Sequence, residues 1–546
     1  MNAPLLDIVG LSVRFGERAA LDNVGLTLEA GEVLGVVGES GSGKTLLARS
    51  VLGLLPHGAT QAAERLHFLG QELQLADAET LRRLRGPGMG LVLQEPLTSL
   101  NPAMKIGDQL TEGLRLHRAL RQRAARERAL RALDEVRIAD PSRAFERYPH
   151  EFSDGQRQRI LIASVLALEP KLIIADEPAT ALDALVGDEI LDLIRARARA
   201  IGAAVLMISH DLAQVARRAD RILVMEQGRV VDQGVAADVL LKPRHAYTRR
   251  LLDAIPRRVA RSGPDAGSAP PLVVARDLAL SYRGSRRGLF ALRPVVRALD
   301  GVSFELRAGE TLAVIGESGS GKSSLAMLAL GLLEPAAGEL AIEGRSWRAR
   351  SRAERRALRR RVQVVFQDPA ASLDPRMSVS AIVGEGLRGL PAAERKMRVA
   401  EALTEVGLTE AQGARFAHQL SGGQRQRVAI ARALVMNPEV VIADEPVSAL
   451  DVTVQAQILE LLERLKRERG FALLFVTHDL AVVERIADRV MVMRDGRVVE
   501  AGTRDEVFDR PRHDYTRRLL SIAPVLVAAG DGFRLERRRL PEPVPA

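Results

Sequence analysis

Two short apolar runs in this chain are each followed by the same glycine-rich turn and then by a helix-like stretch. The first is Val33 to Val37, which precedes the turn at residues 38–45 and the stretch from Leu46 to Leu55. A short, continuous apolar run bounded by turn residues is typical of a buried strand. The same eight-residue motif returns at residues 316–323, with serine in place of the final threonine, so the pattern predicts the order strand, turn and helix twice.

The turn follows the pattern G-x-x-x-x-G-K-[ST], which in this context is typical of a phosphate-binding loop. Glycines let the backbone wrap around the phosphates, and successive N–H groups and the helix N-terminus favour an anion. A glycine-rich turn with a chance lysine is the alternative, and the repeat disfavours it. The lysine would reach the β- and γ-phosphates and the final hydroxyl would ligate Mg²⁺. The expected nucleotide-binding residues are Gly38, Glu39, Ser40, Gly41, Ser42, Gly43, Lys44 and Thr45, and Gly316, Glu317, Ser318, Gly319, Ser320, Gly321, Lys322 and Ser323.

Two further apolar runs each end in an Asp-Glu pair. Leu172 to Ala175 precedes Asp176 and Glu177, and the equivalent run in the second half precedes Asp444 and Glu445. We interpret each as a buried parallel strand with carboxylates at its C-terminal end, where ligands bind in open α/β sheets. The aspartates are expected to hold Mg²⁺ through water, and the glutamates to orient or deprotonate the attacking water. A solvated strand end is the plain alternative.

A glutamine before a proline and a histidine after an apolar run recur at matched places in the two halves. Gln94 and Gln367 each follow a predicted strand, and an amide there can ligate Mg²⁺ or water. His210 and His478 lie 268 residues apart, the same offset as the Asp-Glu pairs, and are interpreted as donors to the γ-phosphate. Singly, either type of residue would more often be a surface amide or a structural histidine.

A serine and glycines precede an apolar helix just upstream of each Asp-Glu strand. Such a helix N-terminus is a further candidate anion site, with a simple capped helix as the alternative. The candidate residues are Ser153, Gly155 and Gln156 in the first half, and Ser421, Gly422, Gly423 and Gln424 in the second. The first segment carries Asp154 where the second has glycine.

The chain has 546 residues, 47% hydrophobic and 27% charged, which suits several globular domains. It has no cysteine, so disulfides, thiolate zinc sites and cysteine-ligated iron–sulfur clusters are excluded. No apolar run is long enough to span a bilayer, and no signal peptide is expected at the N-terminus. The net charge of +10 is compatible with binding to an anionic membrane surface or to nucleic acid. The arginine-rich stretch from Arg348 to Arg361 is interpreted mainly as a solvated helix face, and only 3% aromatic residues disfavour base stacking.

The two halves align along their length, which predicts two similar domains joined by a linker. We expect a first domain at residues 1–256, an exposed flexible linker rich in Pro, Gly, Ser and Ala at 257–271, and a second domain at 272–524. Residues 525–546 are expected to form a basic, proline-containing tail.

Taken together, these motifs resemble the ATP-binding-cassette ATPases over essentially the full chain. The resemblance implies, in each half, a RecA-like P-loop α/β core with an antiparallel β subdomain and an α-helical subdomain. It also implies that Phe15 and Tyr282 stack on adenine, although either could be an ordinary core aromatic. The implied cofactors are ATP and Mg²⁺, with each ATP bound between the phosphate loop of one half and the serine–glycine signature of the other.

Within that family the chain is similar to the oligopeptide, dipeptide and nickel importer ATPases, as if both ATPase subunits were fused, as in microcin C-type peptide or glutathione importers. The resemblance rests on the Gly-Glu-Ser-Gly-Ser-Gly-Lys loops and on the repeated Pro-Arg-His-x-Tyr-Thr-Arg-Arg-Leu-Leu at residues 243–252 and 511–520. It implies a peripheral protein on the cytoplasmic face of the inner membrane, working with two transmembrane permease subunits and, indirectly, a periplasmic solute-binding protein. The helical subdomains would receive the permease coupling helices. A soluble tandem cassette acting on ribosomes or nucleic acid is the alternative, and no nucleic acid partner is expected.

Asp154 departs from the family pattern, which has glycine at that position. If its carboxylate faced the γ-phosphate, repulsion of like charges would weaken the ATP site that includes Lys322 and Glu445. If it pointed to solvent or paired with an arginine, it would have no such effect. Both interpretations are open from the sequence.

Overall fold

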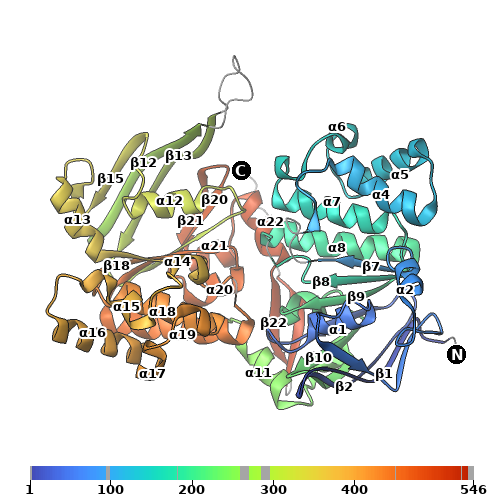
Figure 1. Cartoon of the computed structure of the whole chain (residues 1–546). Helices are drawn as coiled ribbons and strands as arrows, with labels where there is room; N and C mark the ends of the chain where they lie inside the picture. The colour runs from blue at the N-terminus through green and yellow to red at the C-terminus, as the bar shows by residue number, and fades with distance from the viewer. Residues whose placement is uncertain are drawn as a thin grey trace. The chain divides into compact units, whose positions relative to one another are not determined.

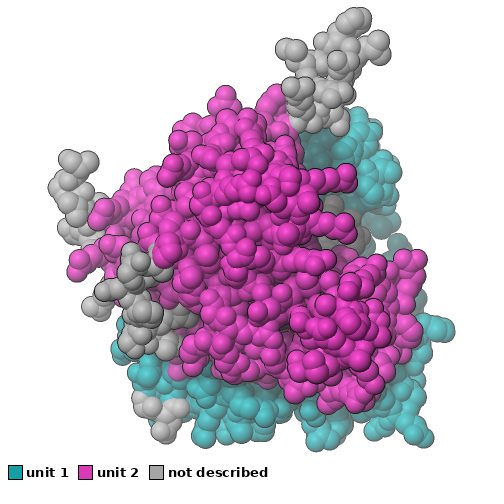
Figure 2. Space-filling view, turned by 90° about the vertical axis from the view of Figure 1, so that its left-hand side faces the viewer, with its two compact units in different colours: residues 1–253, 524–537 teal, residues 254–523, 538–546 magenta. Residues whose placement is uncertain are grey.

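The computed structural model describes residues 3–93, 99–180, 182–258, 270–283, 295–448, 450–529 and 532–538. The chain divides into two compact units, Met1–Asp253 with Pro524–Arg537, and Ala254–Ala523 with Arg538–Ala546 (Figure 2). Each unit contains a six-stranded, mostly parallel sheet, a smaller antiparallel sheet and a group of helices (Figure 1). The predicted α/β fold class with two similar halves is therefore confirmed.

The central sheet of the first unit carries the residues predicted to bind phosphate. Its strand order is β11-β10-β3-β9-β8-β7, and every pair except β10–β11 is parallel. All five residues of both β3 and β8 are buried, as expected for continuous apolar runs covered on both faces. The parallel pairing brings the carboxyl ends of β3, β8 and β9 to one edge. The strands are β3 (Val33–Val37), β7 (Met89–Val92), β8 (Leu172–Asp176), β9 (Ala204–Ser209), β10 (Arg221–Glu226) and β11 (Arg229–Val235).

The antiparallel sheet and the helices complete this unit. The sheet contains β1 (Leu6–Phe15), β2 (Arg18–Leu28), β4 (Ala59–Ala62), β5 (Arg65–Phe68) and β6 (Gln71–Glu72). Buried leucines and valines of β1 and β2 pack with the phosphate-loop helix in one core cluster. The helices are α1 (Lys44–Val51), α2 (Ala78–Leu84), α4 (Ile106–Arg118), α5 (Gln122–Glu135), α6 (Pro141–Phe145), η1 (Pro149–Glu151), α7 (Asp154–Leu166), α8 (Ala184–Ile201), α9 (Leu212–Ala216), α10 (Ala236–Leu241) and α11 (Ala246–Ala254).

The second unit repeats the same plan. Its central sheet has the order β17-β18-β19-β14-β20-β21, and its antiparallel sheet has the order β13-β12-β15-β16. The strands are β12 (Pro271–Arg283), β13 (Val295–Arg307), β14 (Thr311–Ile315), β15 (Ala337–Ile342), β16 (Arg345–Ser346), β17 (Val362–Val365), β18 (Val440–Asp444), β19 (Ala472–Val476), β20 (Arg489–Arg494) and β21 (Arg497–Thr503). The helices are α12 (Lys322–Ala329), α13 (Arg352–Arg361), α14 (Pro369–Ser372), α15 (Val379–Val383), η2 (Gly384–Leu387), α16 (Ala392–Glu405), α17 (Glu410–Gly413), η3 (Ala417–Gln419), α18 (Gly422–Leu434), α19 (Val452–Arg469), α20 (Leu480–Ile486), α21 (Arg504–Asp509) and α22 (Asp514–Ile522).

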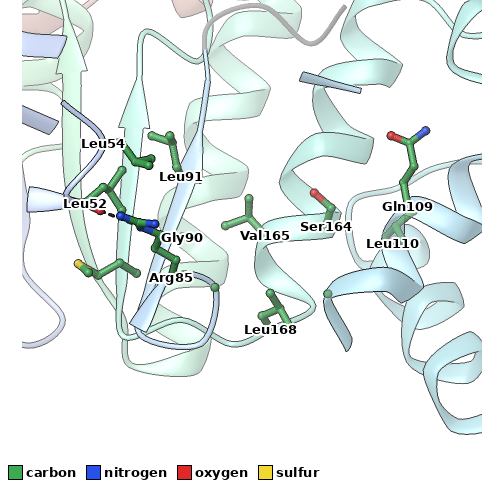
Figure 3. Close-up of a pocket in the computed structure, with 13 residues that line it drawn as sticks. Leu52, Leu54, Arg85, Gly90, Leu91, Gln109, Leu110, Ser164, Val165 and Leu168 are labelled. Atoms are coloured by element: carbon green, nitrogen blue, oxygen red, sulfur yellow. Dashed lines mark hydrogen bonds between the residues drawn. The ribbon is translucent and has the colours of Figure 1, made fainter. Parts of the chain in front are cut away.

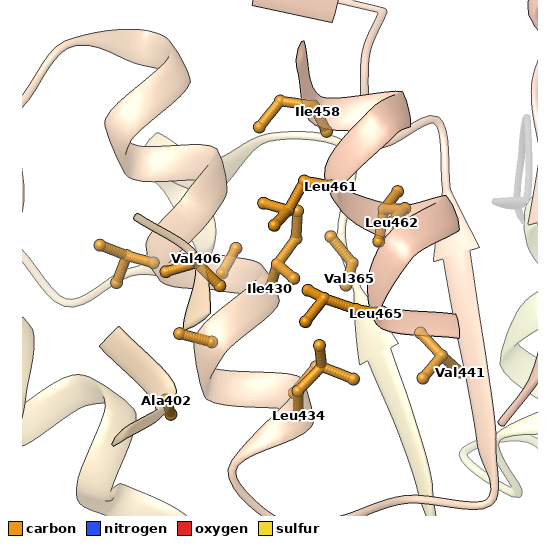
Figure 4. Close-up of a cluster of buried hydrophobic side chains, with 14 of the residues drawn as sticks. Val365, Ala402, Val406, Ile430, Leu434, Val441, Ile458, Leu461, Leu462 and Leu465 are labelled. Atoms are coloured by element: carbon orange, nitrogen blue, oxygen red, sulfur yellow. The ribbon is translucent and has the colours of Figure 1, made fainter. Parts of the chain in front are cut away.

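A continuous apolar cluster joins the helices of the second unit to its central sheet. Ile430 and Leu434 of α18 lie among Leu461 and Leu465 of α19, and Val441 of β18 closes the cluster (Figure 4). Burying each such side chain contributes on the order of 1.5–3 kcal/mol. The serine–glycine segment therefore lies at the start of a helix, α18, whose later residues are packed in the core.

The segment after α22 forms a hairpin that belongs to the first unit. Strands β22 (Pro524–Ala529) and β23 (Gly532–Arg537) pair in antiparallel fashion, and β23 packs on α10. Gly532 makes this contact possible, because a Cβ at that position would lie 2.2 Å from the carbonyl oxygen of Leu240. The sequence predicts only a basic, proline-containing tail at residues 525–546 and leaves its order open. The domain boundaries drawn from the sequence stay a prediction.

Residues at both ends of the predicted linker, 257–271, have a defined structure. Arg258 belongs to the second unit and donates hydrogen bonds to the carboxylates of Asp505 and Asp509 on α21. Pro271 is already the first residue of β12. The rest of the predicted flexible linker, residues 259–269, lies outside the described residues.

The arginine-rich stretch folds into α13, in which only Leu358 is buried. Arg355 pairs with Glu334 and its guanidinium also lies 5.5 Å from the ring centre of Trp347. These contacts agree with an interpretation as a solvated, internally paired helix face. Within the described ranges, no helix has both the length and the apolar composition needed to cross a bilayer.

Candidate nucleotide-hydrolysis sites

The predicted phosphate loop connects the buried strand β3 to helix α1 in the first unit. Lys44 is 5% exposed, and its ammonium group donates to the carbonyl oxygens of Gly38 (2.7 Å) and Glu39 (2.8 Å). A Cβ on Gly38 would lie 2.2 Å from the carbonyl oxygen of Met225, so the loop closes against β10 only with glycine there. The loop is therefore a tight turn that holds the lysine ammonium at its centre.

The second unit reproduces this loop between β14 and α12. Lys322 is also 5% exposed and donates to the carbonyl oxygens of Gly316 (2.7 Å) and Glu317 (2.9 Å). Gly321 before the helix has a positive φ of 102°, matching the 101° of Gly43 in the first loop. The two loops thus agree in detail as well as in sequence.

The predicted magnesium ligands meet at the edge of each central sheet. The Thr45 hydroxyl donates to Asp176 Oδ1 at 3.2 Å, and the Ser323 hydroxyl donates to Asp444 Oδ1 at 3.4 Å. Burial raises the pKa of both aspartates, and the hydroxyl hydrogen bond opposes that shift only in part. A divalent cation at this position would restore the charged form, and hydroxyl, carboxylate and amide oxygens are the donors that Mg²⁺ prefers.

The glutamate after each aspartate is paired with the predicted histidine. Glu177 Oε2 lies 3.1 Å from His210 Nδ1 and also accepts a hydrogen bond of 2.9 Å from the Thr180 hydroxyl. Burial opposes ionisation of Glu177, but the hydrogen bond and charge of His210 outweigh it, so the pKa of Glu177 lies below its ordinary value. The pKa of His210 is raised because Glu177 outweighs the opposing effect of burial. In the second unit Glu445 Oε2 lies 3.2 Å from His478 Nδ1.

Both glutamates adopt a left-handed backbone conformation with a φ of 48°. Such a conformation is uncommon for a residue other than glycine and costs of order 1–3 kcal/mol. Its N–H remains fixed by the neighbouring strand, since Glu177 donates to Ile208 and Glu445 donates to Val476. The same strained conformation occurs at two equivalent positions, directly after β8 and β18. This repetition indicates that the conformation serves to orient the carboxylate.

Gln367 reaches the second glutamate directly, because its side-chain amide donates to Glu445 Oε2 at 3.0 Å. Gln94, its predicted counterpart, lies outside the described residues. The candidate adenine-stacking aromatics are both accessible: Phe15 is 37% exposed at the end of β1 and Tyr282 is 45% exposed at the end of β12. The Tyr282 hydroxyl lies 3.3 Å from the Ser324 hydroxyl, next to the phosphate-loop serine.

The serine–glycine segments form the N-termini of α7 and α18 with matching caps. Ser153 and Gln156 exchange backbone-to-side-chain hydrogen bonds, and Ser421 and Gln424 do the same. Asp154 is the first residue of α7, is 62% exposed, and accepts a hydrogen bond of 2.6 Å from Arg157. The structure therefore favours the interpretation in which Asp154 pairs with an arginine.

Sequence reasoning missed two tyrosines that contact the phosphate loops. The Tyr247 hydroxyl accepts a hydrogen bond from the backbone N–H of Glu39, and the Tyr515 hydroxyl accepts one from Glu317. Their repeated sequence context was recognised, but a repeat alone gave no hint of the partner. The loop, its lysine, the Mg²⁺-type donors and the Glu–His pair together define a P-loop ATPase in each unit.

Comparison with known proteins agrees with this class. The family described as "ABC transporter" matches residues 21–180 and 299–448, and the family described as "Oligopeptide/dipeptide transporter, C-terminal region" matches residues 231–276 and 499–545. The chain belongs to the ABC transporter family and is one of its ATP-hydrolysing, ATP-binding proteins.

Full-length relatives share both halves. The peptidoglycan transport ATP-binding protein YejF of Agrobacterium fabrum is 45% identical over 95% of this chain and 96% of its own length. The glutathione import ATP-binding protein GsiA of Escherichia coli K12 is 43% identical over 93% of this chain and 87% of its own length. A dimeric ATP-binding cassette solved with ADP and phosphate aligns with 42% of this chain and 98% of its own, at 32% identity and a TM-score of 0.38.

Proposed function

We propose that this protein uses ATP hydrolysis to energise the import of peptide-type solutes through a membrane permease. The observation that carries the proposal is the match to the oligopeptide/dipeptide transporter C-terminal region, which occurs twice, at residues 231–276 and 499–545. We propose a di- or oligopeptide, a microcin C-type peptide or a glutathione-like molecule as the solute, and the relatives named for peptidoglycan transport and glutathione import support a solute of this kind. The partners are two transmembrane permease subunits and, indirectly, a periplasmic binding protein, with this chain on the cytoplasmic face of the inner membrane.

In the proposed reaction each glutamate orients or deprotonates the water that attacks the γ-phosphate. Glu177 suits this role because its lowered pKa keeps it ionised at neutral pH. Lys44 and His210 bind the β- and γ-phosphates, and Thr45 and Asp176 hold Mg²⁺, with the equivalent residues acting in the second half. Mg²⁺ supplies charge stabilisation to the phosphates. The pairing of each phosphate loop with the signature of the other half remains the expectation drawn from the family resemblance.

A hollow in the first unit is a suitable place for the permease to dock. Its volume is about 290 Å³, and it lies between the end of α1, strand β7, α4 and the end of α7 (Figure 3). Leu54, Leu91, Val165 and Leu168 give it an apolar lining. Because β7 leads to Gln94 and α7 begins at the signature, a permease segment seated here would contact the elements that carry the nucleotide residues. We propose that an apolar coupling helix of one permease subunit occupies it.

The test is affinity purification of the tagged full-length chain from its native cell after gentle solubilisation. We expect two polytopic membrane proteins to co-purify with the natural chain and the yield of at least one of them to fall with Leu54→Glu, since Leu54 lines the hollow and is 44% exposed. Leu75→Glu is the matched control, because Leu75 is 85% exposed outside the hollow. Ribosomal proteins or nucleic acid retained at high salt, without a permease, would overturn the transport proposal but leave the ATPase intact.

A further inference from the structure

A tyrosine hydroxyl is hydrogen-bonded to the phosphate loop at the same position in both units. The backbone N–H of Glu39 donates to Tyr247 Oη at 2.8 Å, and that of Glu317 donates to Tyr515 Oη at 3.0 Å. The tyrosines are 2% and 3% exposed, so solvent does not compete for the hydroxyl. The same contact forms in both units, between a repeated tyrosine segment and a repeated phosphate loop, so it is a consistent feature of the loop.

The peptide group that receives this contact is the one that anchors the lysine. The N–H of Glu39 and the C=O of Gly38 belong to the same planar peptide. Its C=O accepts the ammonium of Lys44 at 2.7 Å, while its N–H donates to Tyr247. Fixing the N–H therefore fixes the direction of the carbonyl, and through it the position of the ammonium.

Tyr247 is itself held in place at the start of helix α11. The carboxylate of Asp232 in β11 accepts the N–H groups of Arg244 and His245, and the His245 ring accepts the N–H of Tyr247 at 3.2 Å. The guanidinium of Arg250 lies 5.5 Å from the centre of the Tyr247 ring. A hydroxyl placed by this many contacts can define a loop conformation rather than follow it.

The second unit uses the same arrangement with one change of residue. Glu500 replaces the aspartate and accepts the N–H groups of Arg512 and His513, and the His513 ring accepts the N–H of Tyr515 at 3.1 Å. The Gly316 carbonyl again accepts the lysine ammonium at 2.7 Å. The end result at the loop is the same although the anchoring carboxylate is one methylene longer.

We propose that Tyr247 and Tyr515 are positioning residues of the two ATP sites, which act on the phosphate-binding lysines through the Gly-Glu peptide of each loop. Through them the two matches to the oligopeptide/dipeptide transporter C-terminal region, which contain the two tyrosines, contribute to nucleotide binding. Removing the hydroxyl would leave a part-buried N–H without this acceptor and free the peptide to tilt, so the lysine would lose its defined position.

The test measures ATP affinity of the full chain with the second loop disabled by Lys322→Ala. In that background we expect Tyr247→Phe to weaken ATP binding about fivefold to tenfold, and tenfold corresponds to about 1.4 kcal/mol. Tyr148→Phe makes the same chemical change at a partly exposed tyrosine that lies outside the loops, and it should change affinity less than twofold. Melting temperature and circular dichroism establish that each variant is folded.

A double-mutant cycle with Lys44→Ala separates positioning from general support. If the tyrosine acts through the lysine, Tyr247→Phe should weaken binding by less than twofold once Lys44 is gone. Full additivity, or unchanged affinity in Tyr247→Phe alone, would overturn the proposal. The reciprocal set, Tyr515→Phe with Lys44→Ala as background and Lys322→Ala in the cycle, provides an independent second measurement.

Discussion

The ion pair at the start of α7 leads to a quantitative expectation for the variant Asp154→Gly. This substitution restores the residue found at the equivalent position of the second half, Gly422. The Asp154 carboxylate accepts a hydrogen bond of 2.6 Å from Arg157, whose Nε also donates to the carbonyl oxygen of Pro149. Since Arg157 compensates its charge, we expect the carboxylate to exert little repulsion on a bound nucleotide.

The expected magnitude follows from the exposure of the pair. Asp154 is 62% exposed, and exposed i,i+3 ion pairs contribute about 0.2–1 kcal/mol. An effect of that size corresponds to less than about a fivefold change in a rate or affinity. The same substitution should lower the stability of the first unit slightly, because the helix loses an acidic residue in its first turn.

The assay is ATP hydrolysis with the site of Lys44 disabled by Lys44→Ala, so that only the loop of Lys322 turns over. Asp154→Gly should then change the rate of hydrolysis less than about fivefold. Arg157→Gln, which leaves the Asp154 carboxylate uncompensated, should lower the rate below that of the natural chain. Arg157→Gln in the Asp154→Gly background is the control for the lost contact with Pro149. An increase of tenfold or more for Asp154→Gly would refute the reasoning and show that the carboxylate faces the phosphate.

Three further outcomes are expected. Glu177→Gln should lower ATP hydrolysis at its own site by at least about a hundredfold while ATP binding is retained. Phosphate release measures the hydrolysis, and a nucleotide-binding assay measures the affinity. An equal loss of hydrolysis and of binding would contradict a role in activating water. The pKa of His210, measured by NMR titration, should lie above the ordinary value of 6.5 and should fall in Glu177→Gln, because burial lowers this pKa and the hydrogen bond and charge of Glu177 are the main effects that raise it; an unchanged pKa would mean that the ion pair is absent in solution. Gly532→Val should release the C-terminal hairpin from α10 and make it susceptible to proteolysis, because its Cβ would lie 2.2 Å from the Leu240 carbonyl oxygen, whereas Ala528→Val on the exposed side of β22 should not.

Much of the fold and the phosphate loops could be predicted because their signals are local. The apolar run at Val33 to Val37 fills both faces of a parallel strand, and it forms β3 with the same bounds. The run at Leu172 to Ala175 forms β8, which extends one residue further to Asp176. The expected helix after the first loop starts earlier than predicted, at Lys44, and ends at Val51, since Gly53 with a φ of 62° terminates it.

What the sequence did not indicate depends on contacts between distant residues. Tyr247 lies 208 residues from its partner Glu39, so neither periodicity nor spacing reveals the hydrogen bond. The hairpin of β22 and β23 did have a local signal, an apolar run and a Gly-Asp-Gly turn before Phe533, which favours a hairpin. The charge and prolines around it concealed that signal. The partner of Asp154 could not be chosen from sequence, because an arginine three residues away is only one of several possible neighbours.

The C-terminal hairpin belongs to the first unit, and this has a consequence for the synthesis of the protein. The first compact unit ends at Asp253 but also contains Pro524–Arg537. A ribosome must therefore add the 284 residues from 254 to 537 before that unit has all its parts, which takes about 15–60 s at roughly 5–20 residues per second. During this interval the end of α10, against which Gly532 packs in the complete structure, lacks its contact with the hairpin. The ATPase unit that emerges first is therefore completed only after residues 254–523 of the second unit have been synthesised.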